Sequence, residues 1–177
     1  MDHRVSFLAI LPLFVAGPAF AYKLIGIPWD TSLGAYPYIL QPDGVDDITD
    51  GSDLQAVRDA FQQWGCVDGS ALKFEEIDDP NVVADAGDDG KNVLFWAETS
   101  DAALSLGMGP ATLGITIMTG TTDRDGVTYR TDTDIAFNGW DSQWSTDDEA
   151  SQIDVGSIAL HEIGHFLGLD HTCTDAS

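Results

Sequence analysis

The chain has few positive charges. Its 177 residues include seven Lys and Arg against 30 Asp and Glu, so the formal net charge at pH 7 is −23. Nucleic acid and anionic membranes are bound by basic surfaces, and a strongly acidic protein is poorly suited to both. We therefore expect neither a nucleic-acid partner nor a membrane partner.

Long hydrophobic runs are also scarce. The longest, residues 7–16, is too short to span a bilayer as a stable helix. It follows the basic Arg4 and precedes Ala19-Phe20-Ala21, which fits the cleavage rule for secretory signals. The pattern predicts a signal peptide over residues 1–21 and a protein that is secreted, either extracellular or periplasmic. An uncleaved anchor is the alternative.

Only two cysteines are present, Cys66 and Cys173. In an oxidising compartment two cysteines most simply pair with each other. Two other arrangements remain open, namely that both are free and buried, or that Cys173 pairs with a cysteine outside this chain.

The remaining composition is that of one globular domain, residues 22–177, which we expect to be a monomer. Apolar residues make up 44% of the chain and aromatic residues 10%. Residues 53–65 form the clearest helix, with an apolar stripe at Leu54, Val57, Phe61 and Trp64. Ser52 or Asp53 can cap its start, and Gly65 can end it.

Strands are predicted by alternating or continuous apolar runs at 36–40, 72–77, 93–97, 113–119 and 133–138. Trp140 and Trp144 follow in a polar loop. A last helix begins near Ser151 or Asp154 and runs to about Leu167. This order of elements indicates an α+β or mixed α/β fold.

The last helix carries the most informative stretch, in which His161, Glu162, His165, Gly168 and His171 read H-E-x-x-H-x-x-G-x-x-H. One helical turn separates His161 from His165, so both imidazoles can bind one metal ion, and Glu162 lies beside it. His171 reaches the same ion only if the chain leaves the helix at Gly168 and folds back. Three imidazoles with one open position are typical of catalytic Zn²⁺.

This motif resembles the zinc signature of the metzincin metalloproteases. Outside the motif, the order of elements from Trp29 to His171 is similar to the matrixin-like branch. The resemblance implies a twisted, mostly parallel sheet with an antiparallel edge strand, here 113–119, backed by two helices, the second of which carries the zinc ligands. It also implies one catalytic Zn²⁺ on His161, His165 and His171, Glu162 as the general base, and a protein or peptide substrate bound along the edge strand.

The chain departs from the family in three respects. All three methionines lie upstream of His171, so none can form the family's Met-turn; we expect a domain truncated after the third ligand, without the C-terminal subdomain, and a fragment of a longer protein is the alternative. We expect no cysteine-bearing pro-domain before residue 22 and no second, structural zinc, because every histidine after residue 21 belongs to the motif. The main hypothesis is thus a secreted zinc endopeptidase, and the alternative is an inactive zinc-binding remnant or a secreted binding module.

Calcium binding is left open by the aspartates. Asp85, Asp88 and Asp89 lie in one predicted loop, and Asp123 and Asp125 lie in another. Hard carboxylate oxygens in flexible loops are suitable ligands for Ca²⁺. A solvated acidic loop is the alternative.

Overall fold

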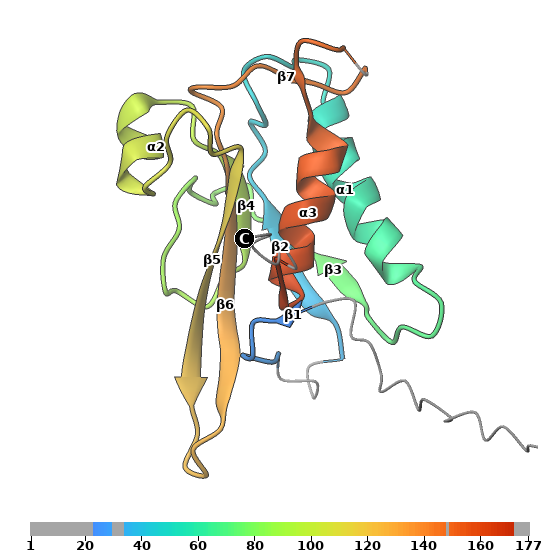
Figure 1. Cartoon of the computed structure of the whole chain (residues 1–177), viewed down its shortest axis with the longest axis vertical. Helices are drawn as coiled ribbons and strands as arrows, with labels where there is room; N and C mark the ends of the chain where they lie inside the picture. Colours follow the sequence, from blue (N-terminus) through green and yellow to red (C-terminus); the bar gives the residue numbers. More distant parts are fainter. Residues whose placement is uncertain (1–22, 30–33, 148, 172–177) are drawn as a thin grey trace, which may run out of the picture.

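A five-stranded sheet forms the centre of the molecule (Figure 1). The computed structural model describes residues 23–29, 34–147 and 149–171. The strand order is β3-β2-β4-β6-β5. The first four strands are parallel, and β5 pairs antiparallel with β6 at one edge. The bounds of these strands are Tyr36–Leu40 for β2, Phe74–Glu76 for β3, Val93–Trp96 for β4, Gly114–Thr122 for β5 and Thr128–Phe137 for β6. The predicted mixed fold and its antiparallel edge strand are confirmed.

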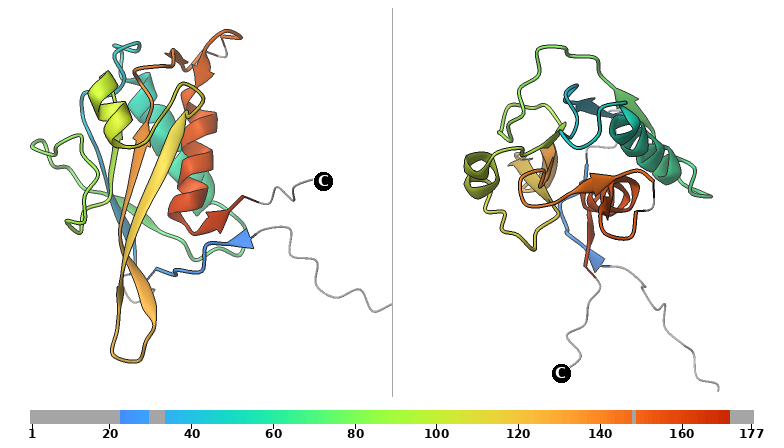
Figure 2. Two further views of the ribbon diagram at one scale, coloured as in Figure 1. Left: turned by 60° about the vertical axis from the view of Figure 1, so that its left-hand side comes forward. Right: turned by 90° about the horizontal axis from the view of Figure 1, so that it is seen from above.

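Two helices, α1 (Ser52–Gly65) and α3 (Val155–Phe166), cover one face of the sheet (Figure 2). Leu94 and Trp96 of β4 point into the larger core shared with these helices. The alternate residues of β4 pack instead with Ala103 and Met108, on and beside the short helix α2 (Ser100–Ser105). Burial on both faces explains why β4 is a continuous apolar run.

The start of α1 differs from the prediction. Its N-cap is Gly51, with φ 79°, and no side chain caps the helix there. Asp53 is buried inside the first turn, where its Oδ2 accepts a hydrogen bond from the Val45 N–H at 2.8 Å. The carboxylate therefore fixes the preceding loop to the helix instead of capping the helix. At the other end the prediction agrees with the structure, since Gly65 is the last residue of α1 and Cys66 is the C-cap.

Two further features were not predicted. The helix α2 is too short for a periodic apolar pattern, and its clearest signal is Thr99, whose side chain accepts a hydrogen bond from the Ala102 N–H. Trp144, predicted to lie in a polar loop, is 1% exposed and belongs to the small strand β7 (Trp144–Ser145), which pairs with β8 (Ile153–Asp154). Its indole Nε1 donates to the carbonyl of Asn138 at 2.9 Å.

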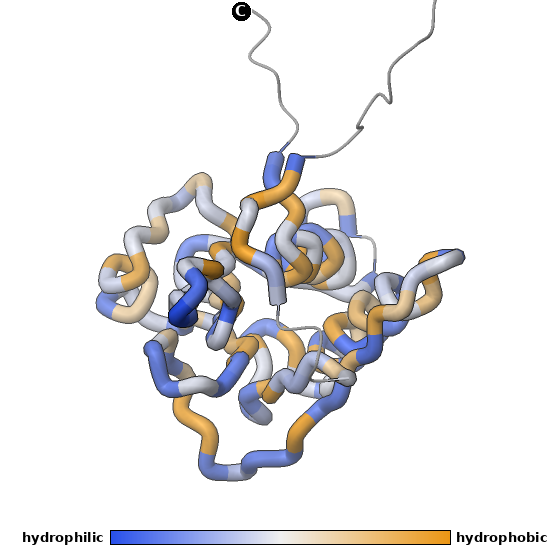
Figure 3. Tube along the Cα trace, turned by 90° about the horizontal axis from the view of Figure 1, so that it is seen from below, coloured by the Kyte–Doolittle hydropathy of each residue, from blue (hydrophilic) through white to orange (hydrophobic). Residues whose placement is uncertain are grey.

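The two ends of the described chain lie side by side (Figure 3). Strand β1 (Lys23–Leu24) pairs antiparallel with β9 (Leu169–Asp170), directly after the turn that ends α3. The Lys23 ammonium also contacts the Asp170 carboxylate at 2.5 Å. Within the described ranges, no helix is long and apolar enough to cross a bilayer.

Candidate metal centre

Helix α3 carries His161, Glu162 and His165, and contacts with its cap and with α1 hold it in place. As predicted, Asp154 is its N-cap, and the side chain accepts a hydrogen bond from the Ser157 N–H at 2.6 Å. Trp64 of α1 donates from its indole to the Leu160 carbonyl at 3.0 Å. A Cβ added at Gly164 would lie 3.4 Å from the Trp64 ring, at the near limit of ordinary van der Waals contact, so the two helices pack closely at this residue.

The chain turns back at Gly168, as the motif predicts. Gly168 has φ 100°, in the left-handed region that glycine adopts without steric cost. The next two residues form β9, and its pairing with β1 precedes His171 directly. The third histidine is therefore positioned by the turn and by a strand pair that includes Lys23, near the start of the described chain.

Buried polar groups hold the C-terminal end of α3. The Trp29 indole donates to the Phe166 carbonyl at 2.7 Å, and Arg130 donates from Nη1 to the same oxygen. Arg130 is 1% exposed and its guanidinium lies over the Trp29 ring. A cation at the C-terminus of a helix is favourable because the last carbonyls carry partial negative charge. Burial nevertheless lowers the pKa of Arg130 to about 10.

The three imidazoles converge. Each Nε2 atom of His161, His165 and His171 lies 3.1 Å from the other two. Among the described residues, these histidines are the only group of three metal-binding side chains whose ligand atoms lie within 4.8 Å of one another. Tetrahedral zinc with Zn–N bonds of about 2.0–2.1 Å places its nitrogens roughly 3.3–3.4 Å apart. The spacing therefore fits one zinc ion.

The protonation of His165 supports the same conclusion. Its Nδ1 lies 2.7 Å from the carbonyl oxygen of Leu169, which can only accept a hydrogen bond. Nδ1 therefore carries the proton, and the lone pair of the neutral ring lies on Nε2, toward the other two histidines. Burial also lowers the pKa of His161, which favours the neutral, ligand form of that ring.

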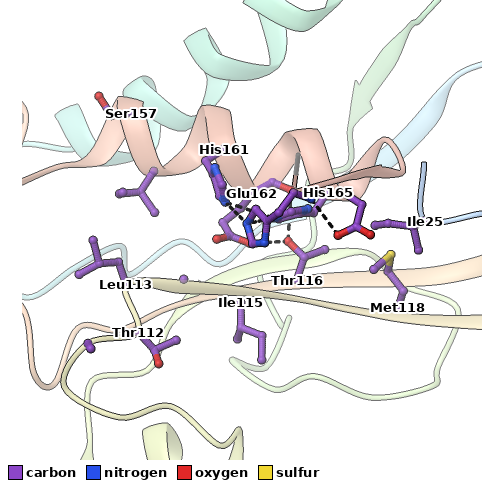
Figure 4. A pocket seen from close by; sticks show the side chains of 15 residues that line it. Ile25, Thr112, Leu113, Ile115, Thr116, Met118, Ser157, His161, Glu162 and His165 are labelled. Carbon is purple, nitrogen blue, oxygen red and sulfur yellow. Dashed lines mark hydrogen bonds between the residues drawn. The ribbon is translucent and has the colours of Figure 1, made fainter. Parts of the chain in front are cut away.

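Glu162 lies on the inner side of the cleft and is 5% exposed. Its Oε2 accepts a hydrogen bond from the Thr116 hydroxyl at 2.6 Å (Figure 4). The cleft, about 860 Å³ in volume, lies between α3 and β5 and is lined by the three histidines and by Leu113, Met118 and Ile158. The motif thus presents three nitrogen ligands and one carboxylate to a single open cavity.

The predicted calcium ligands are not gathered in the same way. Within the described chain, their carboxylates form no group of three convergent ligand atoms. The side chain of Asp123 instead accepts hydrogen bonds from the Asp125 and Val127 amides of its own turn. Asp88 accepts one from the Thr119 hydroxyl at 3.0 Å. Calcium binding stays a prediction.

The other sequence predictions about termini lie partly outside the described residues. Cys66 is exposed at the end of α1, while Cys173 and the signal segment 1–21 are not described. The disulfide therefore also stays a prediction.

Sequence reasoning missed several residues that shape the centre. Thr116 and Gly114 contact Glu162, Arg130 holds the end of α3, and Lys23 holds the segment before His171. The alternation of β5 was a usable signal for Thr116, since it places a hydroxyl on a strand expected beside the motif. Nothing local distinguishes Arg130 or Lys23, because their partners lie far away in the sequence.

Comparison with known proteins agrees with this geometry. The family model of the matrixins, within the M10 peptidases, matches residues 35–177. The chain is also 29% identical over 157 residues to karilysin of Tannerella forsythia, an alignment that covers 85% of this chain and 28% of karilysin. The chain thus spans less than a third of the length of that relative. Since the family model covers most of the sequence and includes the histidine motif, the chain belongs to the matrixin family of metalloproteases.

Proposed function

We propose that the protein is a secreted zinc endopeptidase in which His161, His165 and His171 hold the metal. The observation that carries the proposal is the convergence of three Nε2 atoms at 3.1 Å beside a buried glutamate. A zinc ion bound there would lower the pKa of its water and polarise the scissile carbonyl. The signal segment at residues 1–21 and the matrixin family both favour an extracellular location.

Glu162 would act as the general base. Its carboxylate faces the cleft from the same helix as two of the ligands, and one of its oxygens is already engaged by Thr116. The other oxygen remains to accept a proton from the attacking water and to return it to the leaving amine nitrogen. The two roles follow from adjacent positions on a helix, since His161 and Glu162 differ by about 100° around its axis.

A polypeptide substrate would lie along β5. This strand ends the order of the five-stranded sheet, so among the described strands its second edge is unpaired. The Leu113 carbonyl accepts a hydrogen bond from the Asn138 N–H on the β6 side. Because backbone groups alternate along a strand, those of Gly114 and Thr116 point toward the free edge at the cleft. An extended peptide can pair with them as an added strand.

Two substitutions test the assignment. The full chain should contain about one zinc, as three imidazoles plus a water predict, and should cleave a quenched fluorescent peptide. His165→Ala should lose the zinc, and Glu162→Gln should keep the zinc but lose hydrolysis. Zinc content unchanged in His165→Ala would refute the ligand set, and loss of zinc in Glu162→Gln would refute the role of the glutamate.

The same assay distinguishes the endopeptidase from the alternative of an inactive zinc-binding remnant or binding module. A chain that holds zinc stoichiometrically yet cleaves no peptide from a diverse library would favour that alternative. Buffer with the zinc ion removed by a chelator serves as the blank, since hydrolysis that survives chelation would come from a contaminating enzyme.

A further inference from the structure

The Glu162 side chain packs against strand β5. Residues 114 and 116 lie two apart on the strand, so their side-chain positions face the same way, toward α3. Ile115, between them, packs against the smaller core on the other face of the sheet. Gly114 and Thr116 therefore both meet Glu162, although they are remote from it in sequence.

Gly114 provides the space. A Cβ atom added there would lie 2.9 Å from both Cγ and Oε1 of Glu162, closer than such atoms approach in proteins. The glutamate thus passes directly over the backbone of the strand. Its Oε1 occupies the volume that any larger residue at position 114 would take.

Thr116 provides the hydrogen bond. Its hydroxyl has one proton, and Oγ1 lies 2.6 Å from Glu162 Oε2 but 3.2 Å from the Glu162 backbone carbonyl. The shorter distance falls in the range of about 2.5–2.7 Å typical of a hydroxyl that donates to a carboxylate. The proton therefore goes to Oε2 and leaves Oε1 as the free oxygen.

We propose that Thr116 is a positioning residue for the reaction: its hydroxyl fixes the rotamer of Glu162 and reserves Oε1 for proton transfer. This inference rests on the proposed role of Glu162 as general base. The hydroxyl also links catalysis to substrate binding, because the backbone of the same residue faces the free edge of β5 at which the substrate would pair. A peptide that pairs with the strand would be aligned by the residue that orients the base.

Two variants separate the hydroxyl from the shape of the side chain. Thr116→Val keeps the branched shape that suits a strand and removes the donor, whereas Thr116→Ser keeps the donor. We expect kcat to fall about 10–100-fold in Thr116→Val, the usual effect of removing a supporting hydrogen bond. KM and zinc content should not change, and Thr116→Ser should retain most of the activity. Thr121→Val is the matched control, being exposed on the same strand and distant from the cleft.

Crystal structures of the two variants give a second measure that does not depend on turnover. The Glu162 carboxylate should keep its place in Thr116→Ser and move or occupy several rotamers in Thr116→Val. Unchanged kcat and an unmoved carboxylate in Thr116→Val would overturn the inference, as would an equal loss of activity in both variants. Glu162→Gln, measured alongside, separates the failure of the two proposals. If Glu162→Gln remains active, the proposed function fails. If Glu162→Gln is inactive while Thr116→Val retains full activity, only the role of Thr116 fails.

Discussion

Asp134 should make the protein less stable as pH rises from weakly acidic to weakly basic values. The side chain lies in β6 and is 1% exposed. Its two oxygens accept hydrogen bonds from the backbone amides of Val93 and Gly87, at 2.9 Å and 3.1 Å. Burial raises the pKa of this carboxyl from 3.8 to about 7, and the negative charge of Asp132 adds to the effect.

The sign follows from proton binding. In the unfolded chain the carboxyl ionises near 3.8, while in the folded protein it stays protonated until about pH 7. Between these values the folded state binds more protons, so its stability falls as pH rises. The contribution is fully present below the unfolded pKa and is lost through the folded pKa. Between pH 5 and the folded pKa of about 7 there are about two pH units, and each unit lowers the free energy of unfolding by about 1.36 kcal/mol. Raising the pH from 5 to 8.5 therefore removes about 3 kcal/mol of stability.

Urea unfolding of the wild type and of Asp134→Asn at the two pH values measures this contribution. His161, whose pKa is lowered by burial, acts in the opposite direction, but its effect is the same in both proteins and cancels when they are compared. Relative to wild type, Asp134→Asn should gain about 3 kcal/mol between pH 5 and pH 8.5. Asp78→Asn, an exposed loop substitution, should follow the wild type. Chelator belongs in every sample, because a bound cation would keep Asp134 ionised.

Parallel curves for the wild type and Asp134→Asn would refute the reasoning. That result would mean that the two amide donors outweigh burial and keep the carboxylate ionised in the folded protein. A constant offset between the proteins would not bear on the question, since an asparagine amide facing the Gly87 N–H carries a cost that does not depend on pH.

Three further predictions concern stability and the covalent structure. The Asn92 side chain donates a hydrogen bond to the Pro37 carbonyl and accepts one from the Thr133 N–H, both at 2.7 Å. Asn92→Leu leaves both partners unpaired, at about 1–3 kcal/mol for each buried group, so it should lower the free energy of unfolding in urea by about 2–6 kcal/mol. Asn81→Ala, at an exposed position, should be neutral. Millimolar calcium should raise the melting temperature if the two acidic loops bind it, and an unchanged melting temperature would retire that hypothesis. Non-reducing peptide mapping should recover Cys66 linked to Cys173, a closure of about 100 residues worth up to roughly 4–5 kcal/mol, and free thiols at both positions would contradict the pairing.

Much of the catalytic arrangement was determined by local sequence. The spacing of His161, Glu162 and His165 fixes their directions on any helix, and Asp154 supplies the start of that helix. Gly168 supplies the left-handed turn that brings back His171. These features depend on a few neighbouring residues, so a pattern of letters is enough to predict them.

The strands were predicted for a similar reason. The continuous apolar run of β4 and the alternation of β5 and β6 reflect burial on two faces or on one, which is a property of each segment alone. The cap of α1 was predicted wrongly because Asp53 had two possible partners. The helix amides were near in sequence, but the carboxylate accepts its hydrogen bond from the Val45 N–H, because the loop before the helix folds over Asp53.

Only the tertiary structure decided which groups surround the catalytic residues. The contact of Thr116 with Glu162 joins residues 46 positions apart, and that of Arg130 with Phe166 joins residues 36 apart. Such pairs form when the whole sheet and α3 pack together, and no periodicity in either segment encodes the partner. The sequence by itself therefore identified the residues proposed to bind the metal and to transfer the proton. The packing of α3 on the sheet determined what holds those residues in place.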